Sequence, residues 1–136
     1  MESVKGDEMT REIVSNWFNR LGEGEKDLPL LLLDNIAYTP RTAYNEVMRG
    51  SSVGDRLQAL IETGRFGTST SDEQAIAKTR LEQIMQTKPE KPLFATLSGK
   101  TFTPSQLLEE IRSDSDVGRQ WVKNEIDHMK KLMQIR

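Results

Sequence analysis

The 136-residue sequence contains no cysteine, which excludes disulfide bonds, thiol catalysis and thiolate metal sites together. Its single histidine, His128, has Asn124 and Leu132 one helical turn away, and neither is a metal ligand. No apolar run approaches the roughly 18 residues of a membrane span, and the longest, residues 28–33, is interrupted by Pro29. The first residues also lack the apolar region of a secretory signal. We therefore expect a cytoplasmic protein without metal, cofactor or membrane partner.

The sequence also lacks a strong excess of charge of either sign. It has 19 Lys and Arg against 21 Asp and Glu, for a net charge of −2. Such a balance gives no general attraction to nucleic acid or to anionic membranes. Hydrophobic residues make up 35% of the chain, enough for one core, so residues 1–136 are expected to form a single domain.

An internal similarity appears when each residue is aligned with the one 64 positions later. Residues 33–57 then match residues 97–121 with seven identities, whereas about one or two are expected by chance. The identical pairs are Leu33/Leu97, Thr39/Thr103, Pro40/Pro104, Glu46/Glu110, Ser51/Ser115, Val53/Val117 and Gly54/Gly118. We interpret the chain as two repeat units, residues 28–62 and 92–126, joined by a loop and connecting helix in residues 63–91.

Each unit has the pattern of a β-hairpin followed by two helices. The pairs Thr39-Pro40 and Thr103-Pro104 each predict an N-cap and the first residue of a helix. Upstream of each pair, apolar or β-prone runs flank a two-residue turn, Asp34-Asn35 or Ser98-Gly99, which indicates a hairpin. Because a lone hairpin is marginally stable in water, the two hairpins could share one small sheet.

Amphipathic periodicity predicts three further helices outside this pattern. They are an N-terminal helix over residues 7–21, a middle helix over residues 71–87 and a long C-terminal helix over residues 117–133. The expected fold class is therefore α+β, mostly α, with two similar hairpin–helix–turn–helix units. The predicted core includes Leu33, Val47, Leu57, Leu97, Ile111, Val117 and Trp121.

Two glycines, Gly54 and Gly118, recur near the start of the second helix in each unit. Glycine at such a position costs up to ~1 kcal/mol relative to alanine. Its recurrence beside an identical valine predicts that another backbone packs closely there, for example one unit on the other.

The candidate catalytic motifs each lack residues that the chemistry requires. Glu46 and Glu110 recur as a carboxylate pair, but no further ligands or partner bases recur with them. The stretch Gly99-Lys100-Thr101 resembles the end of a phosphate-binding loop, but Phe94 stands where that motif needs glycine. No serine lies in a nucleophile elbow. No enzymatic activity is therefore expected.

The sequence instead predicts a non-enzymatic protein–protein interaction or assembly module, such as an adaptor, a scaffold or a structural subunit of a larger complex. The terminal helices carry more apolar and methionine positions than one core requires, and such stripes often bury against a partner or a second copy. We expect the last two turns of the C-terminal helix to contact another chain. The predicted interaction residues are Trp17, Phe18, Met129, Leu132, Met133 and Ile135.

The second hypothesis is a small helix-turn-helix DNA-binding regulator. It would use one helix pair together with the basic residues Lys130, Lys131 and Arg136 at the C-terminus. Neither second helix carries a continuous basic stripe, so this hypothesis ranks below protein binding.

Overall fold

The computed structural model describes residues 3–134, which form seven helices and four short strands. The helices are α1 (Ser3–Arg20), α2 (Glu23–Lys26), α3 (Pro40–Arg49), α4 (Ser52–Glu62), α5 (Thr70–Thr87), α6 (Pro104–Arg112) and α7 (Asp116–Leu132). The strands are β1 (Leu31–Leu33), β2 (Ile36–Tyr38), β3 (Phe94–Ala95) and β4 (Thr101–Phe102). The expectation of a mostly helical α+β chain with two hairpins is confirmed.

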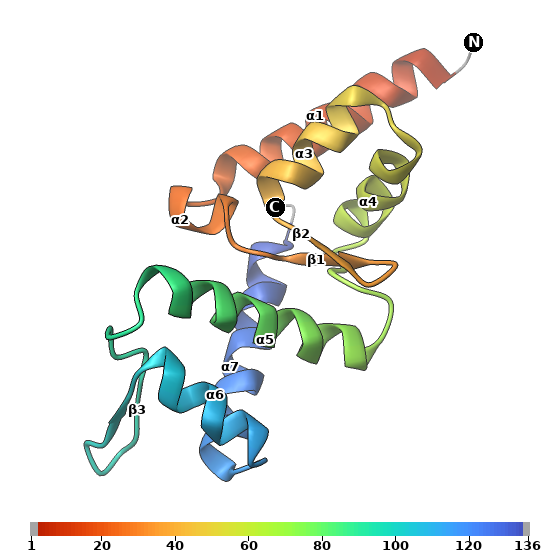
Figure 1. The fold of residues 1–136 in the computed structure, drawn as a ribbon. Coiled ribbons are helices and arrows are strands. Elements are labelled where there is room, and N and C mark those ends of the chain that lie inside the picture. Colours follow the sequence, from red (N-terminus) through yellow and green to blue (C-terminus); the bar gives the residue numbers. More distant parts are fainter. Residues whose placement is uncertain (1–2, 135–136) are drawn as a thin grey trace.

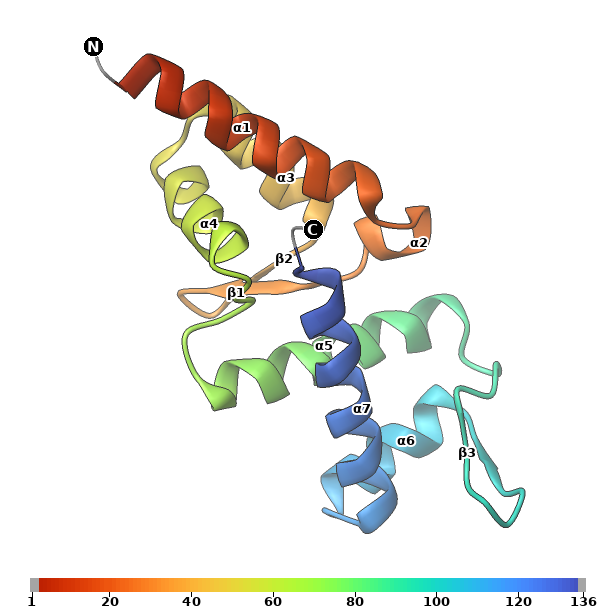
Figure 2. The same ribbon diagram turned by 180° about the vertical axis from the view of Figure 1, so that it is seen from behind.

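The helices form two groups that α7 connects. In Figure 1, α1, α3 and α4 lie on one side of the β1–β2 hairpin, whereas α5, α6 and the β3–β4 hairpin lie on the other. Helix α7 begins beside α6 and runs back toward the first hairpin, so that its C-terminal end reaches the α1–α3–α4 group, as Figure 2 shows from behind. The chain thus returns to its own first half.

The first hairpin follows the sequence prediction. Strands β1 and β2 are antiparallel and pair Leu33 with Ile36 across a two-residue turn. The turn residues Asp34 and Asn35 both have positive φ, 53° and 64°, which is the backbone of a type I′ turn. Asp and Asn tolerate this conformation better than most residues, so the local sequence explains the turn.

The second hairpin differs from the prediction by one residue in its turn. Thr96 and Lys100 still bond each other, with the Thr96 amide 2.9 Å from the Lys100 carbonyl oxygen, so the turn comprises residues 97–99. Gly99 supplies the positive φ of 91° that closes it. Leu97 therefore lies at the tip of the turn and is fully exposed, so its prediction as a core residue is wrong.

The two hairpins do not share a sheet. Each forms its own two-stranded antiparallel sheet, β1 with β2 and β3 with β4. A hairpin of this size needs support from elsewhere. The first receives it from the loop after α4, where the Leu32 amide donates to the Phe66 carbonyl at 2.8 Å and the Phe66 side chain is buried.

Hydroxyl caps start the paired helices. Thr39 and Thr103 accept hydrogen bonds from the backbone at the third helical residue of α3 and α6, and in both helices a full capping box and a first-position proline are present. Ser51 and Ser115 cap α4 and α7 in the same manner. The predicted starts of α3 and α6 are confirmed.

The buried side chains form two clusters. The larger one joins α1, the first hairpin, α3, α4 and the start of α5 with Met129 and Met133 from the end of α7. The smaller cluster consists of Leu81, Phe102, Leu107, Leu108 and Trp121. Leu33, Val47, Leu57 and Trp121 are buried as predicted, whereas Ile111 and Val117 are only partly buried beside the smaller cluster.

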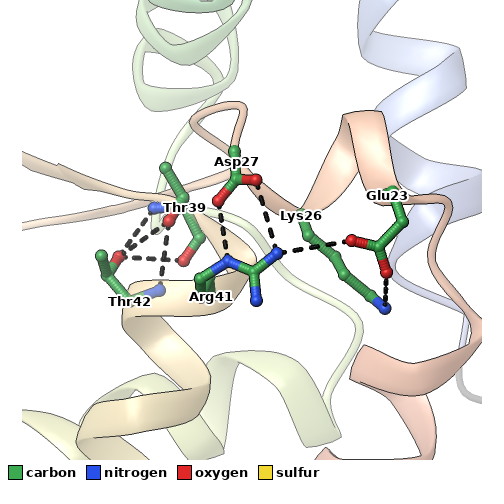
Figure 3. A network of polar contacts seen from close by, with 6 residues as sticks. All are labelled: Glu23, Lys26, Asp27, Thr39, Arg41 and Thr42. Carbon is green, nitrogen blue, oxygen red and sulfur yellow. Dashed lines mark hydrogen bonds and ion pairs between the residues drawn. The ribbon is translucent and has the colours of Figure 1, made fainter.

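Helix α2 is a single turn that the sequence pattern did not predict. A surface network attaches it to the start of α3, as Figure 3 shows. The Arg41 guanidinium contacts Asp27 at 2.8 Å and Glu23 at 3.6 Å, and Lys26 contacts Glu23 at 2.8 Å. Hydrogen bonds from Arg41 hold the pKa of Asp27 below its ordinary value. The network orients the segment that carries Glu25 toward α5 and α7.

Candidate functional site

A groove with a volume of about 840 Å³ lies between α5 and α7. One side is formed by the first half of α5, with Ala75 and Lys78. The opposite side is formed by α7 from Gly118 to Lys130. At about 1.5 Å of rise per residue, that stretch of α7 is about 18 Å long.

The inner lining of the groove is apolar. Ile111 from α6 and Val122 and Ile126 from α7 line it, and all three are only partly buried. Ala75 lines it from α5 and is exposed. The chain therefore leaves aliphatic surface from three helices accessible in one depression.

The charged lining is mainly basic. Lys78 from α5 and Arg119, Lys123 and Lys130 from α7 line the groove, and the three on α7 are exposed. Two carboxylates also line it. Asp114 is held by Arg119, whose Nη1 lies 3.1 Å from its Oδ1 and which also pairs with Asp116. The other is Asp127.

Behind the groove, a buried arginine joins α5 to α7 and to the segment before β1. The side chain of Arg80 is 1% exposed, and its Nε donates to Glu125 Oε2 on α7 at 2.7 Å. Its Nη2 donates to Glu25 Oε1 at 2.8 Å and its Nη1 to the Pro29 carbonyl at 3.0 Å. Helices α5 and α7 are thus fixed relative to each other by charge-assisted hydrogen bonds.

The cluster continues to the only histidine. His128 Nε2 lies 2.8 Å from Glu25 Oε2, so Glu25 bridges Arg80 and His128. Burial raises the pKa of Glu25, but the hydrogen bonds from Arg80 and His128 outweigh burial and hold that pKa below its ordinary value. No buried side-chain nitrogen or oxygen among the described residues lacks a hydrogen-bond partner.

The residues predicted to meet a partner lie elsewhere, at the junction of α1 and the end of α7. Trp17, Met129 and Met133 are almost completely buried in the larger cluster, and Phe18 is buried beside them. The Trp17 Nε1 donates to the Leu132 carbonyl at 2.9 Å, and the Leu132 side chain is partly buried there.

These contacts bear on the expectation that the last two turns of α7 contact another chain. That expectation does not hold for Met129 and Met133, because both are buried in the larger cluster of the same chain. The sequence showed that their stripe is apolar but not which surface buries it. Ile135 lies outside the described residues.

The recurring glycines pack closely, but each against the helix that precedes it in its own half. A Cβ at Gly54 would lie 2.2 Å from the Glu46 carbonyl oxygen, and one at Gly118 would lie 2.5 Å from that of Glu110. The expectation that these glycines bring one unit onto the other is therefore wrong. They allow α4 and α7 to begin directly against α3 and α6.

Glu46 and Glu110 share one local contact. Each accepts a 2.7 Å hydrogen bond from the serine that caps the next helix, Ser51 and Ser115 respectively. Arg49 also contacts Glu46 at 2.6 Å. Both carboxylates thus help to fasten the turns between paired helices, a role that spacing alone did not indicate.

The buried Arg80 and the groove were not predicted from the sequence. Arg80 lies three residues after Ala77 and four before Ile84, so it occupies the apolar face of its helix. A cation at such a position is a signal for a buried ion pair. The lysines of the groove carry no comparable signal, because their convergence depends on how α5 and α7 pack.

Within residues 3–134, no helix is long and apolar enough to span a membrane. No group of three or more histidine or carboxylate side chains in the described part of the chain is placed to hold a metal ion. Comparisons with protein-family models, with curated proteins and with solved structures found no match to this chain.

Proposed function

We propose that the chain is a non-enzymatic protein-interaction module, an adaptor or structural subunit of a larger assembly, and that the α5–α7 groove is its binding surface. The observation that carries this proposal is the accessible aliphatic lining of the groove, which comes from Ile111, Val122 and Ile126. Burying such surface against a partner is favourable by about 25 cal/mol per Å².

The length of the groove suits a helix from a partner. Two helices form its sides, and the lining stretch of α7 is about 18 Å long, the length of roughly three helical turns. A partner helix laid between them would place one apolar stripe on the aliphatic lining. The Arg80 cluster keeps the two sides in place before binding, which lowers the conformational cost of association.

A library of displayed helical peptides tests the proposal. Peptides selected on the intact protein are expected to bind the groove, so Ala75→Trp, which fills it from an exposed position, should weaken their binding at least about tenfold. Ala59→Trp, at an exposed position of α4 outside the groove lining, is the matched control and should leave affinity unchanged. Selection of no peptide, or equal binding to both variants, would contradict the proposal.

We further propose that the two halves are copies of one unit that includes the helix before each hairpin. The Leu30 amide bonds to the Tyr38 carbonyl and the Leu93 amide to the Phe102 carbonyl, both at 2.9 Å. The equivalent donors, Leu30 and Leu93, are 63 positions apart in the sequence, whereas the equivalent acceptors, Tyr38 and Phe102, are 64 positions apart. The extra residue lies in the longer second turn, which accounts for the exposure of Leu97.

Further support comes from contacts and identities on both sides of that turn. The serine caps, the glutamate–serine hydrogen bonds and the close glycines recur at a spacing of 64. Before the turn, a spacing of 63 aligns Pro29-Leu30 with Pro92-Leu93 and places buried Phe18 of α1 over buried Leu81 of α5. Under this alignment α1 and α5 are equivalent helices.

Exchange of equivalent turn residues tests the duplication. Gly50→Asp with Ser52→Asp gives the first half the sequence of residues 114–118 at that turn. Asp114 already adopts positive φ, 55°, as Gly50 does at 74°, so the double variant should lose less than about 1 kcal/mol in urea unfolding. A loss above about 2 kcal/mol would show that the turns are not interchangeable.

A further inference from the structure

We infer that the partner segment is an amphipathic helix whose apolar stripe is flanked by acidic side chains, an inference that rests on the proposed function of the α5–α7 groove. The argument comes from the charges around the aliphatic lining. Lys78 stands on the α5 side, and Lys123 and Lys130 stand on the α7 side. Cations on both sides of a partner helix would meet acidic residues on both edges of its apolar stripe.

The basic character is not cancelled by ion pairs within the described residues. Arg119 is engaged by Asp114 and Asp116, whereas no ion pair of Lys78, Lys123 or Lys130 occurs in that part of the chain. Asp127 is the one remaining carboxylate in the lining. The groove therefore presents an excess of positive charge, although the whole chain has a net charge of −2.

This local charge favours a particular partner chemistry. Lysines on a partly apolar groove attract carboxylates and speed their encounter, while an approaching basic helix is repelled. A nucleic acid backbone would gain from the lysines but would leave the aliphatic lining unused and would meet Asp127. An acidic amphipathic helix satisfies both parts of the lining.

Three labelled peptides of about 12 residues, the length that spans about 18 Å as a helix, test the inference on the intact protein. They share one leucine stripe and carry Glu, Gln or Lys beside it. Fluorescence anisotropy should rank their affinities Glu, then Gln, then Lys, with at least about tenfold between the first and the last. Affinity for the Glu peptide should fall as salt rises.

Charge reversal in the protein supplies the stricter measurement. Lys78→Glu with Lys123→Glu should reverse the ranking, so that the Lys peptide binds more tightly than the Glu peptide. Lys91→Glu, an exposed lysine in the segment before β3 and outside the groove lining, is the matched control and should leave the ranking unchanged.

The outcomes separate this inference from the proposed function. Equal binding of all three peptides, lost in Ala75→Trp, would overturn the acidic preference but leave the groove as a protein-binding surface. Duplex DNA that displaces the Glu peptide from the wild-type protein, and binds more weakly after charge reversal, would assign the lysines to nucleic acid and overturn the inference. Binding of no peptide would contradict both.

Discussion

Replacing Arg80 with methionine tests whether the buried ion cluster holds α5, α7 and the segment before β1 together. Arg80 is 1% exposed and donates to Glu125, to Glu25 and to a backbone carbonyl. Methionine keeps much of the length and apolar volume of the side chain. It leaves Glu125 and the Pro29 carbonyl without the donor Arg80 and leaves Glu25 with His128 alone, so their desolvation is no longer fully compensated.

The expected loss of stability follows from the exposure of the partners. Removing one member of a buried ion pair costs about 3–5 kcal/mol. The side chains of Glu25 and Glu125 remain 24% and 15% exposed, so water can solvate part of each carboxylate in the variant. We therefore expect the lower end, about 3 kcal/mol, which corresponds to a fall in Tm of roughly 12 °C for a chain of this size.

Urea unfolding followed by tryptophan fluorescence measures this loss. Trp17 lies in the larger cluster and Trp121 in the smaller one, so both clusters contribute to the signal. Combining Arg80→Met with Glu25→Gln and Glu125→Gln removes both carboxylate charges that Arg80 no longer compensates and should recover about half of the lost free energy.

An exposed ion pair provides the control for this measurement. Arg56→Met removes the ion pair between Arg56 and Asp34. Both side chains are more than half exposed, so the variant should not shift the urea midpoint measurably. A loss below about 1 kcal/mol for Arg80→Met, or no recovery in the triple variant, would refute the reasoning.

Three further predictions concern single positions. Gly54→Ala should lower the free energy of unfolding by about 2 kcal/mol, because its Cβ would lie 2.2 Å from a carbonyl oxygen. Gly22→Ala is the control and should not lower it, because nothing lies within 4 Å of that Cβ. Equal thermal stability of the two variants would contradict this prediction. The depressed pKa of Glu25 means that its contribution to stability is complete above pH 4.5 and disappears as pH falls through the lower folded-state value. Glu25→Gln should therefore flatten the decline of the urea midpoint in acid, and an unchanged slope would count against that assignment. Met129→Ala should cost about 3 kcal/mol in urea unfolding and the exposed Met9→Ala almost nothing; similar values for both would show that α7 does not complete the core.

Local sequence signals predicted the starts of the paired helices and the first hairpin well. Thr39-Pro40 and Thr103-Pro104 act within one helical turn, so no distant contact decides their conformation. Asp34-Asn35 likewise carries its own preference for positive φ. The second hairpin was placed one residue wrongly because Gly99 closes a longer turn, and a Ser-Gly pair does not distinguish the two lengths.

Features that depend on tertiary packing could not be predicted in the same way. The partners of Arg80 lie 45 and 55 residues away, so their convergence is set by how α2, α5 and α7 pack. The apolar stripe of α7 was recognised, but an apolar stripe fits a partner chain and the same chain equally well. In the sequence the groove lysines are ordinary helix-surface residues, and only the packing of α5, α6 and α7 places them around one aliphatic lining.

The two halves of the chain differ in what covers them. The first half receives the end of α7, whose Met129 and Met133 complete the larger cluster and whose backbone bonds to Trp17. Among the described residues, no corresponding helix lies over the α5–α7 groove of the second half, and the aliphatic lining there stays accessible. Because α7 both closes the first half and forms one side of the groove, a helix bound there would pack on an element that is already held at its other end. That arrangement favours a preformed binding surface over one assembled on binding.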